Sequence, residues 1–344
     1  MKVLTRVLTG AALATGLLSL VTQSTPTFAA NAVSHVLLLS VDGFHAVDLE
    51  FCIANNSCPN LKLLSGQGLT YTNASTTKPS DSFPGLLAPI TGGTSASHGV
   101  FYDDSYDRTL FAPINASTPP APCAIGPGAE VMLAENIEKD KTKIDGGVAG
   151  SLTGLNAGVA IDPNNLPGQK VSGSCTPLWP HNFIRTNTIF GVVHKHGLRT
   201  AWSDKHPAYD IINGNEPKTQ PVNGPGTNVD DFFAPEINSD LSAANISLIH
   251  SVGLSSTKPD PKPPFSGDFT SRIDAVEWYD GIKVQATLNQ INGLDHTGKH
   301  PRGTPVLFGM NFQSVSVGQK LAGDGYINPA ATPSTDLANA IAFV

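Results

Sequence analysis

The 344-residue sequence predicts an α/β fold in which a largely parallel sheet lies between layers of helices. Two observations predict it: short apolar, β-branched runs alternate with amphipathic segments, and several of these runs end in polar residues. A hydrophobic content of 40% with 14% charged residues is typical of a globular protein and excludes a coiled coil or a disordered chain. The formal net charge of −7 gives no indication of a nucleic-acid-binding surface.

Residues 1–29 have the features of a secretory signal peptide. Lys2 and Arg6 precede an apolar run of small residues, Val7–Val21, and a polar stretch ending in small residues follows. The run is shorter than the about 20 residues that a transmembrane helix needs, and an uncleaved anchor is the alternative. We therefore predict a secreted or periplasmic protein without stable membrane insertion, with one domain over residues 31–344.

Four cysteines in an exported chain predict two disulfides. Cys52 and Cys58 flank a turn-rich loop and can close it locally. Cys123 and Cys175 would then pair across an insertion rich in Pro and Gly. The connectivity stays open at this point, because spacing alone does not determine it. A zinc site is the rival interpretation, and the absence of a C-x-x-C pair argues against it.

The N-terminal half of the domain is predicted to alternate strands and helices. Val33–Val41 is a nearly continuous apolar run, typical of a strand buried on both faces of a parallel sheet. Pro59–Gly68 carries leucines one turn apart and is predicted to be a short amphipathic helix. Leu69–Thr72 is predicted to be a second short strand. A further helix is expected to open at Pro84, since proline is favoured in a first turn.

The C-terminal half continues the alternation. Asn187–His196 has the apolar period of a helix, and Gly197 is a natural end for it. Two irregular stretches, Ala112–Pro180 and Asn213–Phe269, are interpreted as loop insertions, with a small satellite subdomain as the alternative. The other predicted elements are strands over Leu198–Trp202 and Pro305–Met310 and helices over Tyr279–Asn292 and Ser334–Val344, the last with Ser334 or Thr335 as N-cap.

Polar residues at two predicted element ends indicate where chemistry would take place. Ligands of open α/β sheets bind beyond the carboxyl ends of the strands, and Asp42 follows the first strand. Ser82 lies at the mouth of a predicted helix, where free N–H groups and the helix dipole favour negative charge. The structural alternatives are an Asx turn of Asp42 with Gly43 and an N-cap role for Ser82. Together the carboxylate and the hydroxyl form half of a metal-assisted site.

Asp204, Lys205 and His206 follow the predicted strand Leu198–Trp202 and are expected at the same edge of the sheet. The D-x-H spacing suits one metal ion or, together with the lysine, a cluster that faces a phosphate. A solvated loop is the alternative. We predict Asp204 and His206 as further metal ligands, and Lys205 as a catalytic cation that offsets charge on the substrate.

Several short motifs carry a family resemblance. They are Asp42-Gly43-Phe44, Ser82-Phe83-Pro84, Thr91-Gly92, Ser97-His98-Gly99-Val100 and Tyr106-Asp107. Together they resemble the type I phosphodiesterase/nucleotide pyrophosphatase family of the alkaline phosphatase superfamily, specifically over Val33–Asp107 and more loosely over Asn187–Lys320. The resemblance implies an alkaline-phosphatase-like three-layer sandwich with loop insertions. It further implies hydrolysis of a phosphodiester or nucleotide pyrophosphate through a phosphoserine at Ser82, with two zinc ions, one of them held by Asp42 and Ser82.

The sequence departs from the family pattern at three places. Gly85 stands where the family has an Asn that donates to a phosphoryl oxygen, a donor worth ~3 kcal/mol by analogy with oxyanion holes. Phe308–Lys320, where the D-x-x-x-H pair of the second metal would fall, has no carboxylate or imidazole between its ends. The family's last ligand histidine would lie beyond Val344. We therefore expect a C-terminally truncated domain with an incomplete second zinc site.

Two alternatives to a diesterase follow from these departures. One is an inactive relative that binds a phosphorylated ligand without turnover, and the other is a phosphomonoesterase of the same superfamily. Other enzyme classes lack their motifs: Ser82 has no G-x-S-x-G, the first strand has no G-x-G-x-x-G after it, and the arginine of a sulfatase motif is absent where Leu86 stands. The predicted partner is a small-molecule phosphoester or nucleotide, and the oligomeric state stays open.

Overall fold

The computed structural model describes residues 33–115, 123, 126–133, 137–215, 224–321, 325–327 and 332–344. The chain divides into the units Met1–Ser34 and His35–Val344, and every element named below belongs to the second. The predicted signal peptide, residues 1–29, lies outside the described residues. Within the described part of the chain, no helix combines the length and the apolar character needed to cross a bilayer.

Four parallel strands form the central sheet, in the order β1 (Val36–Val41), β8 (Leu307–Phe312), β6 (Thr200–Ser203) and β7 (Phe232–Phe233). The predicted parallel sheet is therefore confirmed. β8 lies between β1 and β6 and is buried along its whole length, as its apolar sequence predicts. Its centre needs a glycine, because a Cβ at Gly309 would collide with the backbone of β1.

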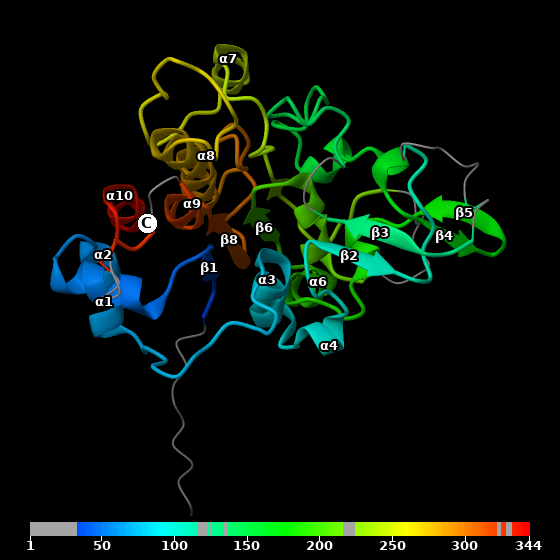
Figure 1. Ribbon diagram of the computed structural model, residues 1–344, viewed down its shortest axis with the longest axis horizontal. Helices are drawn as coiled ribbons and strands as arrows, with labels where there is room; N and C mark the ends of the chain where they lie inside the picture. The colour runs from blue at the N-terminus through cyan, green and yellow to red at the C-terminus, as the bar shows by residue number, and fades with distance from the viewer. Residues whose placement is uncertain are drawn as a thin grey trace, which may run out of the picture. The chain divides into compact units, whose positions relative to one another are not determined.

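Helices cover both faces of this sheet, which confirms the predicted layered α/β architecture. On one face α3 (Ser82–Thr91) and α6 (Ile189–Lys195) share a hydrophobic core with Trp202 of β6. On the other face α8 (Ile273–Ile291) packs against β6 and β8 and forms a second core with Phe233 of β7. Figure 1 shows β1, β8 and β6 between α8 on one side and α3 with α6 on the other.

A third hydrophobic core joins helices from the two ends of this unit. It brings together α1 (Ala46–Ala54), α2 (Pro59–Gln67), α9 (Ser314–Lys320) and α10 (Thr335–Phe343). The predicted C-terminal helix is confirmed together with its cap, since the Ser334 hydroxyl accepts the backbone N–H three residues further on at 3.1 Å. This core places α9, which follows β8, beside the segment that follows β1.

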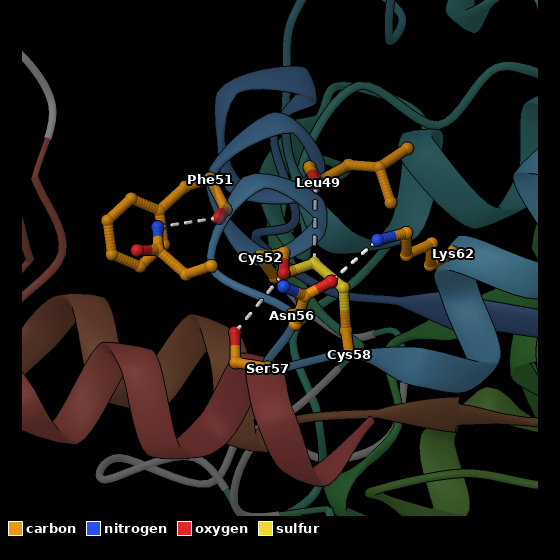
Figure 2. The surroundings of a disulfide bond; sticks show 8 residues. Leu49, Phe51, Cys52, Asn56, Ser57, Cys58 and Lys62 are labelled. Atoms are coloured by element: carbon orange, nitrogen blue, oxygen red, sulfur yellow. Dashed lines mark hydrogen bonds between the residues drawn. A yellow bond between two sulfur atoms is a disulfide. The ribbon is translucent and has the colours of Figure 1, made fainter.

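Both predicted disulfides, Cys52–Cys58 and Cys123–Cys175, are present. All four cysteines are therefore paired, and the zinc alternative for them is excluded. The first disulfide closes the turn between α1 and α2, as Figure 2 shows. In the same turn the Ser57 hydroxyl donates to the carbonyl of the first cysteine, and Lys62 Nζ donates to Asn56 Oδ1 at 2.6 Å.

Smaller elements lie outside the central sheet. β2 (Asp104–Asp107) pairs antiparallel with β3 (Ala129–Met132), and β4 (Gly168–Val171) pairs antiparallel with β5 (Ser174–Pro177). The first predicted insertion therefore contains strands as well as loops. The remaining elements are the helices α4 (Ser95–His98), α5 (Pro180–Phe183) and α7 (Ala243–Ser251) and the 3₁₀ turns η1 (Ala157–Ala160), η2 (Pro163–Asn165) and η3 (Pro207–Asn213).

The prediction that the first strand is buried on both faces is wrong. β1 lies at one end of the sheet, and β8 is its one neighbour among the described strands. Val36, Leu37 and Leu39 are accordingly 48%, 43% and 48% exposed. An apolar run indicates that a strand prefers burial, but the number of its neighbours is decided by the rest of the chain.

Three further element predictions need correction. Leu69–Thr72 is not a strand, because no described segment pairs with it. The helix expected to open at Pro84 begins two residues earlier, at Ser82. The helix predicted from Tyr279 begins at Ile273, since the buried face of α8 extends one and a half turns towards its N-terminus.

Candidate active site

Asp42 lies directly after β1, at the carboxyl end of the strand. Its backbone N–H donates to the Phe312 carbonyl of β8 at 3.0 Å, so the residue continues the ladder between the two strands. Gly43 follows with φ of +75°, and a Cβ at this position would lie 2.8 Å from the Ser316 Cα of α9. The turn after Asp42 therefore requires glycine.

Ser82 is the first residue of α3 and not its N-cap, which is Asp81. The Ser82 hydroxyl donates to Asp42 Oδ2 at 2.9 Å, so it is engaged by the strand end instead of by the helix backbone. The N-cap alternative for Ser82 is therefore not realised. Pro84, two residues into the helix, has no N–H and leaves this helix end with fewer donors than an ordinary first turn.

Lys205 completes a group of three side chains. It follows β6 by two residues, and its Nζ donates to Asp42 Oδ2 and to Ser82 Oγ, both at 3.0 Å. The Lys205 and Asp42 side chains are 12% and 18% exposed, and this low exposure strengthens their attraction. The structure thus brings together three predicted site residues, and Lys205 lies more than a hundred positions along the sequence from the other two.

The charge of Lys205 sets the protonation state of Asp42. Burial by itself raises the pKa of the Asp42 carboxyl. The positive charge of Lys205 and the hydrogen bonds from Lys205 and Ser82 outweigh burial, and Lys320 adds a smaller effect. The pKa of Asp42 therefore lies below its ordinary value, and Asp42 is an anion at neutral pH.

Asp42 and Ser82 line a pocket of about 430 Å³. Asn311 of β8 and Gln319 and Lys320 of α9, the helix that follows it, line the same pocket. The sequence prediction missed these three residues, because it searched that segment for carboxylates and imidazoles. Their position at and beyond the carboxyl end of a buried parallel strand is the signal that indicates them.

Asp204 is fully buried and engaged on both carboxylate oxygens. It accepts hydrogen bonds from Trp202 Nε1 at 2.7 Å, the Lys205 backbone N–H at 2.8 Å and Asn311 Nδ2 at 3.2 Å. Burial raises the pKa of Asp204, and the charge of Lys283 is the main opposing influence. Asp204 thus holds the backbone of Lys205, whose side chain reaches Asp42, and the side chain of Asn311, which lines the pocket.

His206 lies with a different set of residues. Its Nδ1 is 2.8 and 2.9 Å from the two carboxylate oxygens of Glu236, and Glu138 completes a buried trio whose ligand atoms all lie within 4.8 Å of one another. Elsewhere in the described chain, no three His, Cys, Asp or Glu side chains approach so closely. Asp42, Asp204 and His206 therefore do not form one cluster.

The described residues do not fit the two-zinc site that the family resemblance implies. Asp42 and Ser82 bring two oxygen ligands together, but the described residues gather no trio of His, Cys, Asp or Glu around them. The Lys205 ammonium already lies 3.0 Å from both oxygens. A cation of the chain itself thus takes the place between carboxylate and hydroxyl that a bridging metal ion would take.

Two comparisons with known proteins found similar proteins. A family model described as type I phosphodiesterase / nucleotide pyrophosphatase matches residues 36–210, a span that includes Asp42, Ser82 and Lys205. A similar solved structure is a phosphonoacetate hydrolase from Sinorhizobium meliloti 1021 in complex with phosphonoacetate, at 11% identity and a TM-score of 0.40. That alignment covers 90% of this chain and 51% of the other, so the chain spans about half the length of that protein.

No curated protein sequence matches the chain. The family model nevertheless covers more than half of the 344 residues and extends over the strand end, the helix start and the lysine that form the site. The chain belongs to the type I phosphodiesterase / nucleotide pyrophosphatase family.

Proposed function

We propose that the chain hydrolyses phosphoesters, with phosphodiesters and nucleotide pyrophosphates as the preferred substrates, through a covalent intermediate on Ser82. The observation that carries this proposal is the position of the Ser82 hydroxyl, which contacts both the Asp42 carboxylate and the Lys205 ammonium beside a pocket. A hydroxyl held between a proton acceptor and a cation is arranged for nucleophilic attack. Membership of the family supports the class of substrate.

In the first step Ser82 Oγ forms a bond to phosphorus, while the bond from phosphorus to the leaving oxygen breaks. The Ser82 proton passes to Asp42 Oδ2, with which it already shares a hydrogen bond, and Lys205 stabilises the charge on Oγ. Asp42 is a weak base because its pKa is lowered. Phosphoryl transfer tolerates a weak base, since its transition state is loose and depends mostly on positioning and charge.

In the second step water attacks the phosphorus of the intermediate, and the bond between Ser82 Oγ and phosphorus breaks. Asp42 returns its proton to Oγ, the proton of the attacking water leaves with the phosphate product, and the site returns to its starting state. The pocket is lined by two carboxyl groups, Asp42 and Asp81, and Lys205 and Lys320 supply two positive charges beside them. The lysines therefore reduce the repulsion that the carboxyl groups exert on an anionic substrate.

Metal dependence and export are part of this proposal. The family resemblance implies a zinc requirement. Around Asp42 and Ser82, however, the described residues do not gather the ligands of a zinc ion, so the two steps are assigned to Asp42, Ser82 and Lys205 alone. Two disulfides suit an oxidising compartment and support export of the chain.

Hydrolysis of bis(4-nitrophenyl) phosphate by the full chain tests the function. We expect Ser82→Ala to lower kcat/KM by about 10³-fold or more, because the nucleophile is lost. The matched control is Ser266→Ala at an exposed loop position, which should keep full activity. A quenched reaction should yield a phosphorus adduct on the peptide that contains Ser82.

Three further arms of this assay separate the alternatives. Faster turnover of 4-nitrophenyl phosphate than of the diester would identify a monoesterase. Loss of turnover with a chelator and its recovery with zinc would establish metal dependence. A folded chain that binds phosphate but turns over neither ester, with or without zinc, would contradict the proposal in favour of a binding protein.

A further inference from the structure

Glu138, His206 and Glu236 form a buried cluster that the proposed reaction does not use. Their exposed fractions are 3%, 3% and 1%. His206 follows β6 and Glu236 follows β7, so two neighbouring parallel strands of the sheet deliver them to the same edge. Glu138 comes from the first insertion, where an antiparallel bridge to Ile161 holds its backbone. Three separate segments thus converge on one point.

The hydrogen bonds of this cluster account for Glu236 and His206 but not for the burial of the Glu138 carboxyl group. The Glu236 carboxylate contacts His206 Nδ1 and accepts the backbone N–H of Asn238 at 2.9 Å. Both carboxylate oxygens of Glu138 are buried, and the group that they face is the carboxylate of Glu236 and not a neutral or cationic donor. Two buried carboxyl groups side by side are costly unless they share a proton or a cation.

Placing two carboxyl groups together in a buried site has an electrostatic cost. Glu138 and Glu236 are both almost fully buried, and a carboxylate oxygen of each lies within 4.8 Å of the other. Two carboxylates cannot both stay ionised in a dry site unless a cation joins them. A doubly charged ion balances two carboxylates and a neutral imidazole, and the buried site then carries no net charge.

We propose that Glu138, His206 and Glu236 bind a divalent transition-metal ion, with zinc as the first candidate. One imidazole nitrogen and two carboxylates are a ligand set that zinc accepts, with a fourth position for water. The imidazole argues against calcium or magnesium, which prefer oxygen ligands throughout. The three ligand atoms already lie within 4.8 Å of one another, so side-chain adjustment suffices to close them on an ion.

The site is distinct from the pocket but adjacent to it in the chain. Lys205, which reaches Asp42 and Ser82, immediately precedes His206, and its carbonyl accepts the Ile237 N–H at 3.0 Å. A bound ion would therefore tie together the two segments that hold Lys205 in place. This positioning role rests on the proposed function, whereas metal binding does not.

Zinc binding by the chelator-treated full chain tests the proposal, with bound zinc counted by elemental analysis after dialysis. We expect Glu138→Gln to bind one equivalent less than the unmodified chain. The matched control is Glu130→Gln, an exposed glutamate on β3, which should bind as much zinc as the unmodified chain. Asp42→Asn should also retain this ion, which separates the site from the pocket.

A second readout is the visible absorption of bound Co²⁺, which reports coordination without any activity assay. The spectrum should appear with the unmodified chain and with Asp42→Asn, and it should be absent with Glu138→Gln. Should Glu138→Gln not fold, Glu236→Gln serves as the test with the same expected loss. Equal zinc content and equal Co²⁺ spectra in the unmodified and Glu138→Gln chains would overturn the proposal, as would absence of both signals from the unmodified chain.

Discussion

Lys205 is the residue whose charge most directly sets the chemistry of the pocket. We predict that Lys205→Met lowers kcat/KM by about 10²–10³-fold, because the charge developing on Ser82 Oγ loses its cation. The pKa of Asp42 should rise, since burial is then opposed by weaker influences. The acid limb of the kcat/KM profile should therefore move to higher pH.

The control for this prediction is Lys205→Arg, which keeps the positive charge. Its acid limb should stay close to that of the unmodified chain even if its activity is reduced by a changed geometry. An acid limb that does not move in Lys205→Met would show that Asp42 is not the group that accepts the Ser82 proton.

Gly85 marks a place where a lost donor can be restored. It lines the pocket one turn into α3, and the nearest atom to a Cβ added there is Thr76 Oγ1 at 3.8 Å. We predict that Gly85→Asn raises kcat/KM on the diester by about 10-fold, up to about 100-fold if the amide reaches the phosphoryl oxygen. Gly85→Ala fills the same space without a donor and should give no such rise. Equal rates in the two variants would contradict a donor role at this position.

Position in the sequence was sufficient to predict some site residues but not to predict which residues they contact. Asp42 and Lys205 follow strands, and Ser82 starts a helix, so local patterns place all three at element ends. Local patterns did not indicate the partners of His206, because Glu236 and Glu138 come from other segments of the chain. The partner of a side chain depends on where its helix or strand packs in the fold, and a short stretch of sequence does not contain this information.

At the scale of elements, a buried ion pair anchors the loop after α8 to the start of β7. His296 Nδ1 lies 2.5 Å from Asp231 Oδ1, and both side chains are fully buried. The imidazole also stacks on Phe233 of β7 with ring centroids 4.7 Å apart. We predict that His296→Gln lowers the free energy of unfolding by about 2 kcal/mol, because Asp231 loses one of its two charged partners and keeps Arg199 at 3.2 Å.

The same pair gives stability a pH dependence of known sign. Burial lowers the pKa of His296, but the hydrogen bond and the charge of Asp231 outweigh it, so the folded-state pKa is raised. This stabilisation is complete below the ordinary histidine pKa of about 6.5 and is lost as the pH rises through the folded-state value. Urea unfolding at about pH 6 and about pH 8.5 should show a smaller pH difference for His296→Gln than for the unmodified chain.

The exposed pair of His250 with Asp260 provides a matched control for this prediction. His250 Nε2 lies 3.1 Å from Asp260 Oδ1, and the two side chains are 47% and 54% exposed. His250→Gln should change the free energy of unfolding by less than about 1 kcal/mol. Equal effects of the two histidine substitutions would show that burial does not decide the strength of the pair at His296.

Elements were predicted best where burial is complete. β8 is buried at every position, and its apolar run predicted it to within two residues at each end. β1 has an equally apolar sequence but lies at one end of the sheet in the described chain, so its predicted burial was wrong. The apolar composition of a strand indicates that it can be buried, while its place in the sheet determines how much of its surface neighbouring elements cover.

For the whole molecule, the two disulfides constrain the unfolded chain unequally. Cys52–Cys58 spans 6 positions and Cys123–Cys175 spans 52. Loop-closure entropy predicts stabilisation of about 2 kcal/mol from the first and about 4 kcal/mol from the second. Urea unfolding of the two double Cys→Ser variants should therefore show the larger loss for Cys123→Ser/Cys175→Ser. The reverse order would mean that native packing around the local turn matters more than chain entropy.

The sequence by itself determined the fold class and the family, and it predicted Asp42, Ser82 and Lys205 as site residues. Each of these follows from a local pattern, because apolar period, turn residues and motifs are encoded within short windows. Tertiary structure alone decided that Lys205 lies between Asp42 and Ser82 and that His206 faces Glu138 and Glu236. Such contacts depend on strand order and on the path of the insertions, since these bring residues a hundred positions apart to the same edge of the sheet.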